Sequence, residues 1–208
     1  MAIDVKPTRS ELIKLKQRIK LAKSGYNLLK RKRDGLILEF FEILKRAKSV
    51  RQELMAAYKE ALHKVNVARA VEGDITLQSL GLSIADHGEV SIETKNIMGV
   101  VVPKIQSHKL RRGSLERGYG LIGVSARVDE AAEAFEAVVE HVIKAAEVET
   151  SMKKLLSEIE KTKRRVNALE FEIIPRLERT RVFISLRLEE LERENIFRLK
   201  RIKKKTPS

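Results

Sequence analysis

The sequence predicts a mainly α-helical protein: a long antiparallel two-helix coiled coil with a small insertion that contains a β-hairpin. Two long stretches repeat apolar residues in a three-and-four rhythm, the pattern of a coiled-coil strand. Residues 74–125 between them break this rhythm. The composition agrees, because 35% of the 208 residues are charged, only 4% are aromatic and Trp is absent.

The first helix has Arg33 and Lys64 as the only charged residues on its apolar seam. Its seam positions are Leu12, Leu15, Ile19, Ala22, Tyr26, Leu29, Arg33, Leu36, Phe40, Ile43, Ala47, Val50, Leu54, Ala57, Ala61, Lys64, Ala68 and Val71. Thr8 is expected to cap the first turn, with Glu11 reaching back to the cap residue. Residues 72–74, Glu-Gly-Asp, are expected to end the helix. Such a helix spans roughly 90 Å and needs a second long helix as its partner.

The insertion is expected to hold a short helix over residues 76–85 and two β-prone runs. Residues 88–94 and 97–102 form these runs, with Lys95 and Asn96 between them and Pro103 after them. The alternation of β-branched and polar residues predicts a β-hairpin. An isolated hairpin is marginal in water, so it must lean on the helices or on a partner.

Helical spacing resumes in the second long helix. Its seam positions are Phe135, Val138, Val142, Ala145, Val148, Met152, Leu155, Ile159, Thr162, Val166, Leu169 and Ile173. Pro175 then interrupts the rhythm, and Leu177, Ile184, Leu188 and Leu191 resume it on a shifted phase. Antiparallel pairing predicts that residues whose numbers add to roughly 199 to 209 face each other.

Four segments follow from these elements. They are an N-terminal coiled-coil helix (1–72), a connecting segment (73–125), a C-terminal coiled-coil helix (126–202) and a basic tail expected to be disordered (203–208).

The formal net charge of +14 is unevenly distributed. Residues 1–33 carry a net charge of +9 and residues 163–208 carry +7, whereas residues 126–162 carry −4. If the two ends of the chain lie side by side, the molecule has one strongly basic end. A basic coiled coil that binds nucleic acid or an anionic membrane is therefore an alternative interpretation.

No catalytic, cofactor or metal site is expected. The chain has no Cys, and its four scattered His are expected on the surface. Residues 118–123 match G-x-G-x-x-G, but no hydrophobic strand precedes them, so the match is read as a loop. No apolar run approaches the ~20 residues of a membrane span, which predicts a soluble or peripherally attached protein.

Four stretches resemble the D subunit of the A-type and V-type rotary ATPases. They are residues 5–12 (VKPTRSEL), 30–36 (KRKRDGL), 97–100 (IMGV) and 162–176 (TKRRVNALEFEIIPR). The resemblance implies a non-catalytic central rotor shaft that couples ion flow to ATP synthesis or hydrolysis. It implies as partners the catalytic A and B subunits, the small F subunit of the stalk and the funnel-shaped C subunit above the membrane ring. It also implies a peripheral location on the cytoplasmic face of the cell membrane.

The resemblance places the basic end inside the catalytic hexamer. The residues expected there are Lys14, Arg18, Lys30, Arg31, Lys32, Arg33, Lys163, Arg164, Arg165 and Arg187. The hairpin lies at the other end of the coiled coil, where a regulatory role is expected for Gly88, Val90, Ile92, Met98, Gly99 and Val101.

Arg33 carries one further hypothesis, because an unpaired guanidinium in an apolar seam is costly. Antiparallel pairing places it opposite residues 166–176, where Glu170 and Glu172 stand beside Pro175. Arg33 is therefore expected to pair with one of these glutamates and help fix the register of the helices.

Overall fold

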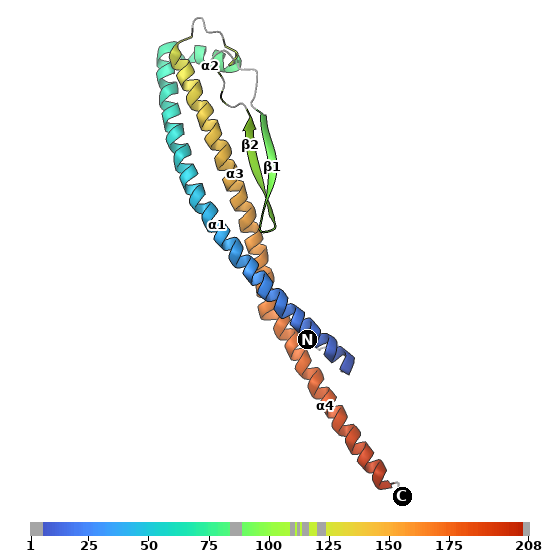
Figure 1. The fold of residues 1–208 in the computed structure, drawn as a ribbon. Helices are drawn as coiled ribbons and strands as arrows, with labels where there is room; N and C mark the ends of the chain where they lie inside the picture. The colour runs from blue at the N-terminus through green and yellow to red at the C-terminus, as the bar shows by residue number, and fades with distance from the viewer. Residues whose placement is uncertain are drawn as a thin grey trace. The chain divides into compact units, whose positions relative to one another are not determined.

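The computed structural model describes residues 6–83, 89–108, 111, 113, 117–119 and 124–205. It consists of two compact units. The first unit contains residues 1–35 and 159–208, and the second contains residues 36–158. Helix α1 (Arg9–Glu72) contributes to both units, and so does helix α3 (Ala126–Ala168). The elements are drawn in Figure 1.

Helix α1 begins and ends where the sequence predicts. The Thr8 hydroxyl accepts a hydrogen bond from the Glu11 N–H at 3.3 Å, which caps the first turn. The reciprocal half of the expected cap is absent, because the Thr8 N–H donates to the Lys6 carbonyl at 2.9 Å. At the other end Gly73 has φ +84° and donates its N–H to the Arg69 carbonyl at 3.0 Å. A side chain with a Cβ rarely adopts this φ, so glycine stops the helix here.

The predicted seam of α1 is the face that the structure buries. Every predicted position from Leu12 to Ala68 is buried or partly buried, and only Val71 is exposed. On the C-terminal side of the pair Val142, Ile173 and Leu191 depart from the pattern, since they are 47%, 40% and 39% exposed. The long rhythm therefore identifies the packed face along almost its whole length.

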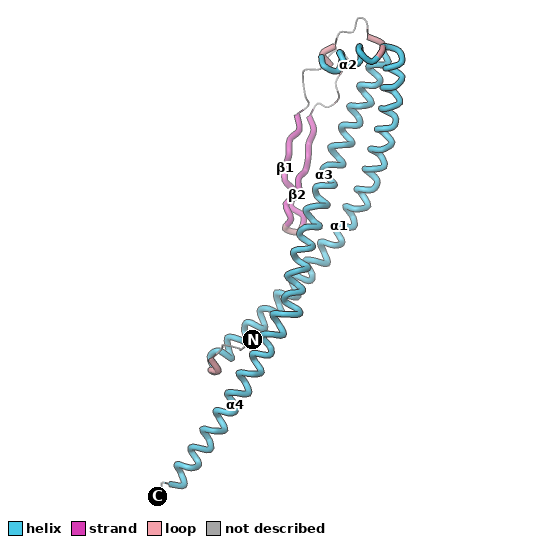
Figure 2. Tube along the Cα trace, turned by 180° about the vertical axis from the view of Figure 1, so that it is seen from behind, coloured by secondary structure: helices cyan, strands magenta, loops and turns pink. Residues whose placement is uncertain are grey.

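In the first unit α1 pairs with helix α4 (Ile174–Lys205). Leu15, Ile19 and Ile184 form a buried cluster, and Leu12, Leu177 and Leu188 pack against it. The Lys23 ammonium lies 2.7 Å from the Glu178 carboxylate, and Arg9 pairs with Glu192. The residue numbers of both pairs add to 201, as the antiparallel prediction requires. Figure 2 shows the two helices side by side.

In the second unit α1 pairs with α3. Arg51 lies 3.4 Å from Glu149, and their numbers add to 200. Ala68 is fully buried in a cluster with Val128 and Ala131. The register is thus the same in each unit when each is taken by itself.

A two-stranded antiparallel hairpin belongs to the second unit and runs alongside α3 (Figures 1 and 2). Its strands are β1 (Glu89–Ile97) and β2 (Val100–His108). The predicted turn at Lys95 and Asn96 is wrong, because the chain turns at Met98 and Gly99. These residues have φ +50° and +85°, the left-handed pair that a tight two-residue turn requires. Asn96 instead stabilises the turn by accepting the Gly99 N–H at 2.8 Å.

Strand β2 continues past Pro103, which was expected to close it. Pro103 stands opposite Thr94, and the ladder alternation from the turn makes this a non-hydrogen-bonded pair. The missing N–H of Pro103 therefore faces the outer edge of β2 and costs no ladder bond. Two residues on, the outward N–H of Ile105 donates to Glu147 of α3 at 3.3 Å. Val100 and Val102 are buried on one face of the hairpin.

The short helix α2 (Asp74–Ser83) confirms the expected helix after Gly73, and residues 84–85 of that prediction lie outside the described residues. At the C-terminus Lys203, Lys204 and Lys205 belong to α4 and are not disordered, contrary to the prediction. The remaining three residues of that tail lie outside the described residues. The four-segment division of the chain stays a prediction.

The expected interruption near Pro175 takes the form of a π-helix over Leu169–Ile173. Pro175 has no N–H to donate to the carbonyl four residues earlier, and its ring would crowd that carbonyl in an α-helix. The wider turn relieves this conflict: the Ile174 N–H donates to Leu169, five residues back. The π-helix inserts one residue, which explains the predicted phase shift between Leu169 and Leu177.

Candidate functional surfaces

The ten basic residues predicted at one end of the molecule all belong to the first unit. Three pair along their own helix: Lys14 with Glu11 at 3.1 Å, Arg164 with Glu160 at 3.9 Å and Arg187 with Glu190 at 2.7 Å. Lys30 lies 5.7 Å from the centroid of the Tyr26 ring. These four are exposed, and so are Arg18, Arg31, Lys163 and Arg165. Lys32 is partly buried. Exposed ion pairs of this kind contribute at most ~1 kcal/mol, so these charges shape a surface more than they hold a fold.

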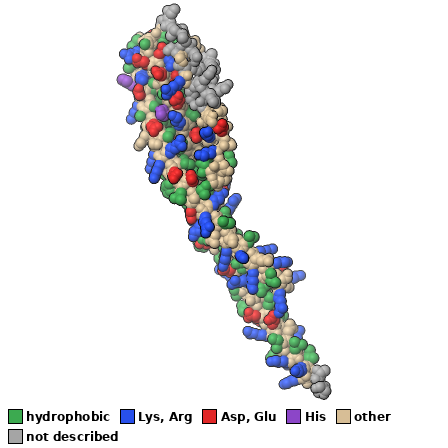
Figure 3. All heavy atoms as spheres, viewed as in Figure 1, with side chains coloured by type: hydrophobic (Ala, Val, Ile, Leu, Met, Phe, Trp, Pro, Cys, Tyr) green, Lys and Arg blue, Asp and Glu red, His purple; other side chains and the backbone are tan. Residues whose placement is uncertain are grey.

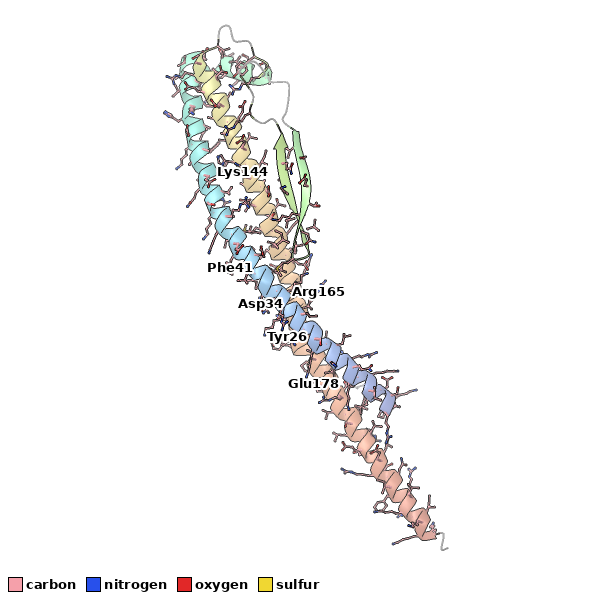
Figure 4. The ribbon with its side chains drawn as sticks, viewed as in Figure 1. Tyr26, Asp34, Phe41, Lys144, Arg165 and Glu178 are labelled. Atoms are coloured by element: carbon pink, nitrogen blue, oxygen red, sulfur yellow. The ribbon has the colours of Figure 1, made fainter. Side chains whose placement is uncertain are left out.

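The hypothesis that Arg33 pairs with Glu170 or Glu172 is wrong. The Arg33 guanidinium donates to the Asp34 carboxylate next to it, at 3.0 and 2.8 Å. Its side chain stays 25% exposed, which lets the charge reach water along the side of the seam. Glu170 and Glu172 stand on the π-helix and are exposed. The inserted residue changes the direction of side chains there, so pairing by residue number fails at this point. Figure 4 labels Asp34 on α1.

The hairpin residues predicted to be regulatory divide between a face and a turn. Val90, Ile92 and Val101 lie on one face of the sheet, and they are 48%, 69% and 53% exposed. Met98 and Gly99 form the turn. Gly88 lies outside the described residues. One face of the hairpin is thus apolar and open to contact.

The sequence did not predict a buried polar cluster at the start of α3. The Arg117 side chain is 7% exposed and donates to both carboxylate oxygens of Glu136, at 3.0 and 3.2 Å. It also lies 3.1 Å from Asp129, whose carboxylate accepts the Tyr119 hydroxyl at 2.6 Å. Two carboxylates on one face of α3 thereby hold Arg117 and Tyr119 against the helix. Only the seven-residue spacing of Asp129 and Glu136 hinted at this face in the sequence.

The electrostatics of this cluster follow from its burial. Desolvation disfavours the charge of Arg117, but the hydrogen bonds to Glu136 and Tyr119 and the charges of these groups together outweigh it and raise the pKa of Arg117 above its ordinary value. Burial, together with the hydrogen bond to Asp129, raises the pKa of Tyr119. Both groups therefore keep one protonation state across the physiological range.

Neighbouring contacts tie three helices together around Tyr119. Tyr119 is buried with Ala68 of α1 and Val128 of α3, and Leu77 of α2 packs against the same cluster. The Ser125 N–H donates to the Glu72 carboxylate at 2.9 Å. The arrangement connects α1, α2 and the start of α3 within the second unit.

Among the described residues, no group of three or more His, Asp or Glu side chains could hold a metal ion. Within the same residues, no helix is long and apolar enough to cross a membrane. Of the histidines, His141 is partly buried and not a surface residue, and its Nδ1 has no hydrogen-bond partner in this part of the chain.

The comparisons with known proteins agree on one family. The sequence model of the ATP synthase D subunit matches residues 11–204. The A-type ATP synthase D subunit of Methanococcoides burtonii is 61% identical over 203 residues, which cover 98% of each chain. The protein of the same name from Methanosarcina acetivorans is 58% identical over 96% of each chain. That of Haloarcula marismortui is 53% identical over 99% of this chain and 89% of its own.

The similarity extends over nearly all of the chain. The chain belongs to the family of ATP synthase D subunits.

Proposed function

We propose that this chain is the central rotor shaft of an A-type ATP synthase. It transmits torque between the ion-translocating ring in the membrane and the catalytic hexamer of A and B subunits. It is itself non-catalytic and peripheral, on the cytoplasmic face of the cell membrane. Its further partners are the small F subunit of the stalk and the funnel-shaped C subunit.

The observation that carries this proposal is the antiparallel register within each unit. A shaft must resist unwinding, and two helices joined by a buried seam and by cross-helix ion pairs resist it better than one helix. Lys23–Glu178 and Arg51–Glu149 are such ion pairs, one in each unit. The family membership supports the same role.

We also propose roles for the two predicted surfaces. The basic residues of the first unit contact the hexamer, and the apolar face and turn of the hairpin affect coupling or regulation. Nucleic-acid binding is less favoured, because exposed apolar side chains such as Phe183 and Leu186 stand among the basic residues of the first unit and gain little from a phosphate backbone. The green and blue side chains alternate on the face of that unit seen in Figure 3.

The test is rotation of single molecules. The chain has no Cys, so Gln78→Cys, at an exposed position of α2, provides a unique attachment point for a bead. The chain is assembled with the A and B subunits, and the hexamer is immobilised. ATP is expected to drive rotation of the bead in one direction. A bead that stays still on a hexamer that hydrolyses ATP and retains the chain would contradict the proposal.

A further inference from the structure

The α4 helix of the first unit has a second apolar face besides the one that packs on α1. Leu177, Ile184 and Leu188 face α1. Val182, Phe183 and Leu186 do not belong to that cluster and are 49%, 46% and 56% exposed. A helix that covers one seam and keeps a second apolar row open is built for a second contact.

This second row lines a shallow groove of about 550 Å³ that begins at Pro175, just after the π-helix. Arg179 and Arg181 are part of the same lining. We call it the arginine groove. The inserted residue of the π-helix sets the rotation of α4 and therefore the direction of this row, and π-helices are frequent at functional sites.

The arginine groove continues onto α1 through Arg181. Two further hollows, of about 370 and 360 Å³, both include Arg181 and Lys16 in their linings. The second of them also contains Lys20 and Lys23. Lys16 and Lys20 are one helical turn apart, so their charges project from the same side of α1.

The charge of this continuous surface is strongly positive. Among the residues that line the three hollows, Glu178 is the acidic one, and Lys23 already binds it at 2.7 Å. The position of Glu178 on α4 is labelled in Figure 4. The charge of Arg181 also acts on Glu178, and Lys16, Lys20 and Arg179 add further positive charge to the same linings. The surface therefore combines an apolar row with an excess of positive charge beside it.

We propose that the arginine groove binds a protein segment that carries carboxylates next to apolar side chains. This inference rests on the proposed function, so the segment belongs to one of the proteins that surround the shaft. Apolar anchors fill the row of Val182, Phe183 and Leu186, while the carboxylates pair with Arg179, Arg181 and the lysines of α1. Arginine suits the carboxylates because its planar guanidinium binds both oxygens at once.

The apolar row is what favours protein over phosphate. A nucleic-acid backbone neutralises cations but gains little from three aliphatic or aromatic side chains set side by side. Protein interfaces combine aromatic anchors with arginine at their centre. Charge complementarity alone would fit either partner, and the apolar row decides between them.

The test uses the assembled complex and a photo-crosslinking residue, p-benzoylphenylalanine, in place of Phe183. Illumination is expected to join position 183 to a peptide of another protein of the complex that has Asp or Glu within a few residues of an apolar side chain. The double variant Arg179→Glu with Arg181→Glu should reduce the yield at least about fivefold, since it removes the paired charges. Added salt should reduce the yield as well.

The matched control reverses two exposed charges of the second unit, Lys45→Glu with Arg46→Glu, and should leave the yield unchanged. Two results would contradict the binding role of the arginine groove and leave the rotor proposal unaffected. One is a complex that retains the chain but gives no crosslink, and the other is a crosslink to a segment without carboxylates. Failure of the unmodified chain to assemble would overturn the rotor proposal. If the double variant of the arginine groove lost binding to phosphatidylserine vesicles while its crosslinking stayed unchanged, the proposed protein partner would be wrong. The groove would then bind a membrane.

Discussion

The Arg117 guanidinium donates two hydrogen bonds, of 3.0 and 3.2 Å, to the carboxylate of Glu136 on α3. This contact lies beneath the surface, because the two side chains are 7% and 17% exposed. Removal of Arg117 would take this ion pair away from a carboxylate that is largely withdrawn from water. The contact thus holds Arg117 against α3 within the second unit.

Arg117→Met is expected to destabilise the second unit by about 3 kcal/mol, the cost of breaking a buried ion pair. Hydrogen exchange at the first turns of α3 should report the loss. The matched control is Arg111→Met. Arg111 binds Glu140 through two bonds as well, but its side chain is 65% exposed. That change should cost no more than ~1 kcal/mol. Equal costs for the two variants would contradict the role of burial.

Arg33→Leu is expected to stabilise the first unit, by about 1 kcal/mol, since leucine would bury apolar surface in the seam without the cost of holding a charge there. Arg33 gains only a pair with the adjacent, half-exposed Asp34. Thermal unfolding followed by circular dichroism measures the change. Arg31→Leu, at an exposed position, is the control and should not raise the melting temperature.

Lowering the pH below about 4.5 is expected to weaken the first unit through Glu178. The hydrogen bond from Lys23 and its charge lower the pKa of Glu178 beneath the ordinary value of 4.5. A lowered pKa means that the contribution is fully present above 4.5 and is lost as the pH falls through the folded-state value. Glu178→Gln should therefore flatten the acid limb of the melting temperature. An unchanged acid limb would show that the pair does not contribute.

Deletion of Phe171 is expected to convert the π-helix into a regular α-helix. Phe171 is 74% exposed, so little packing is lost with it. The deletion alone should destabilise α4, because Pro175 would then crowd the carbonyl four residues before it, as in any α-helix interior. Combining the deletion with Pro175→Ala should recover most of the melting temperature. If the melting temperature did not recover in the double variant, Pro175 would not be the cause of the π-helix.

Replacement of the hairpin, residues 89–108, by a short flexible linker is expected to leave the helical circular dichroism largely intact. The helices α1 and α3 pair through their own seam, and the hairpin lies beside α3 (Figure 2). The rate of ATP hydrolysis or its coupling in the assembled complex should change. Collapse of the helical signal would show that Val102, which is 2% exposed, is essential to the packing of α3.

The sequence determined the helices because their rhythm is long. Eighteen successive seam positions identify which face of α1 is buried, and one apolar face at 3.5-residue spacing already implies a partner of the same kind. Thr8 and Gly73 marked the ends of α1 for reasons that are local to the backbone. The positive charge of the two chain ends and the family resemblance could also be identified from the sequence alone.

Only the tertiary structure decided the contacts that depend on phase. The sequence analysis placed the turn at Lys95, between the two β-prone runs. The structure turns at Met98 and Gly99, because these two successive residues adopt the positive φ that a two-residue turn requires. The π-helix moved Glu170 out of reach of Arg33, since one inserted residue redirects every side chain near it. Arg117 contacts Glu136 of α3 although Arg117 itself lies outside the helices and strands, so no helical or strand spacing rule relates the two positions.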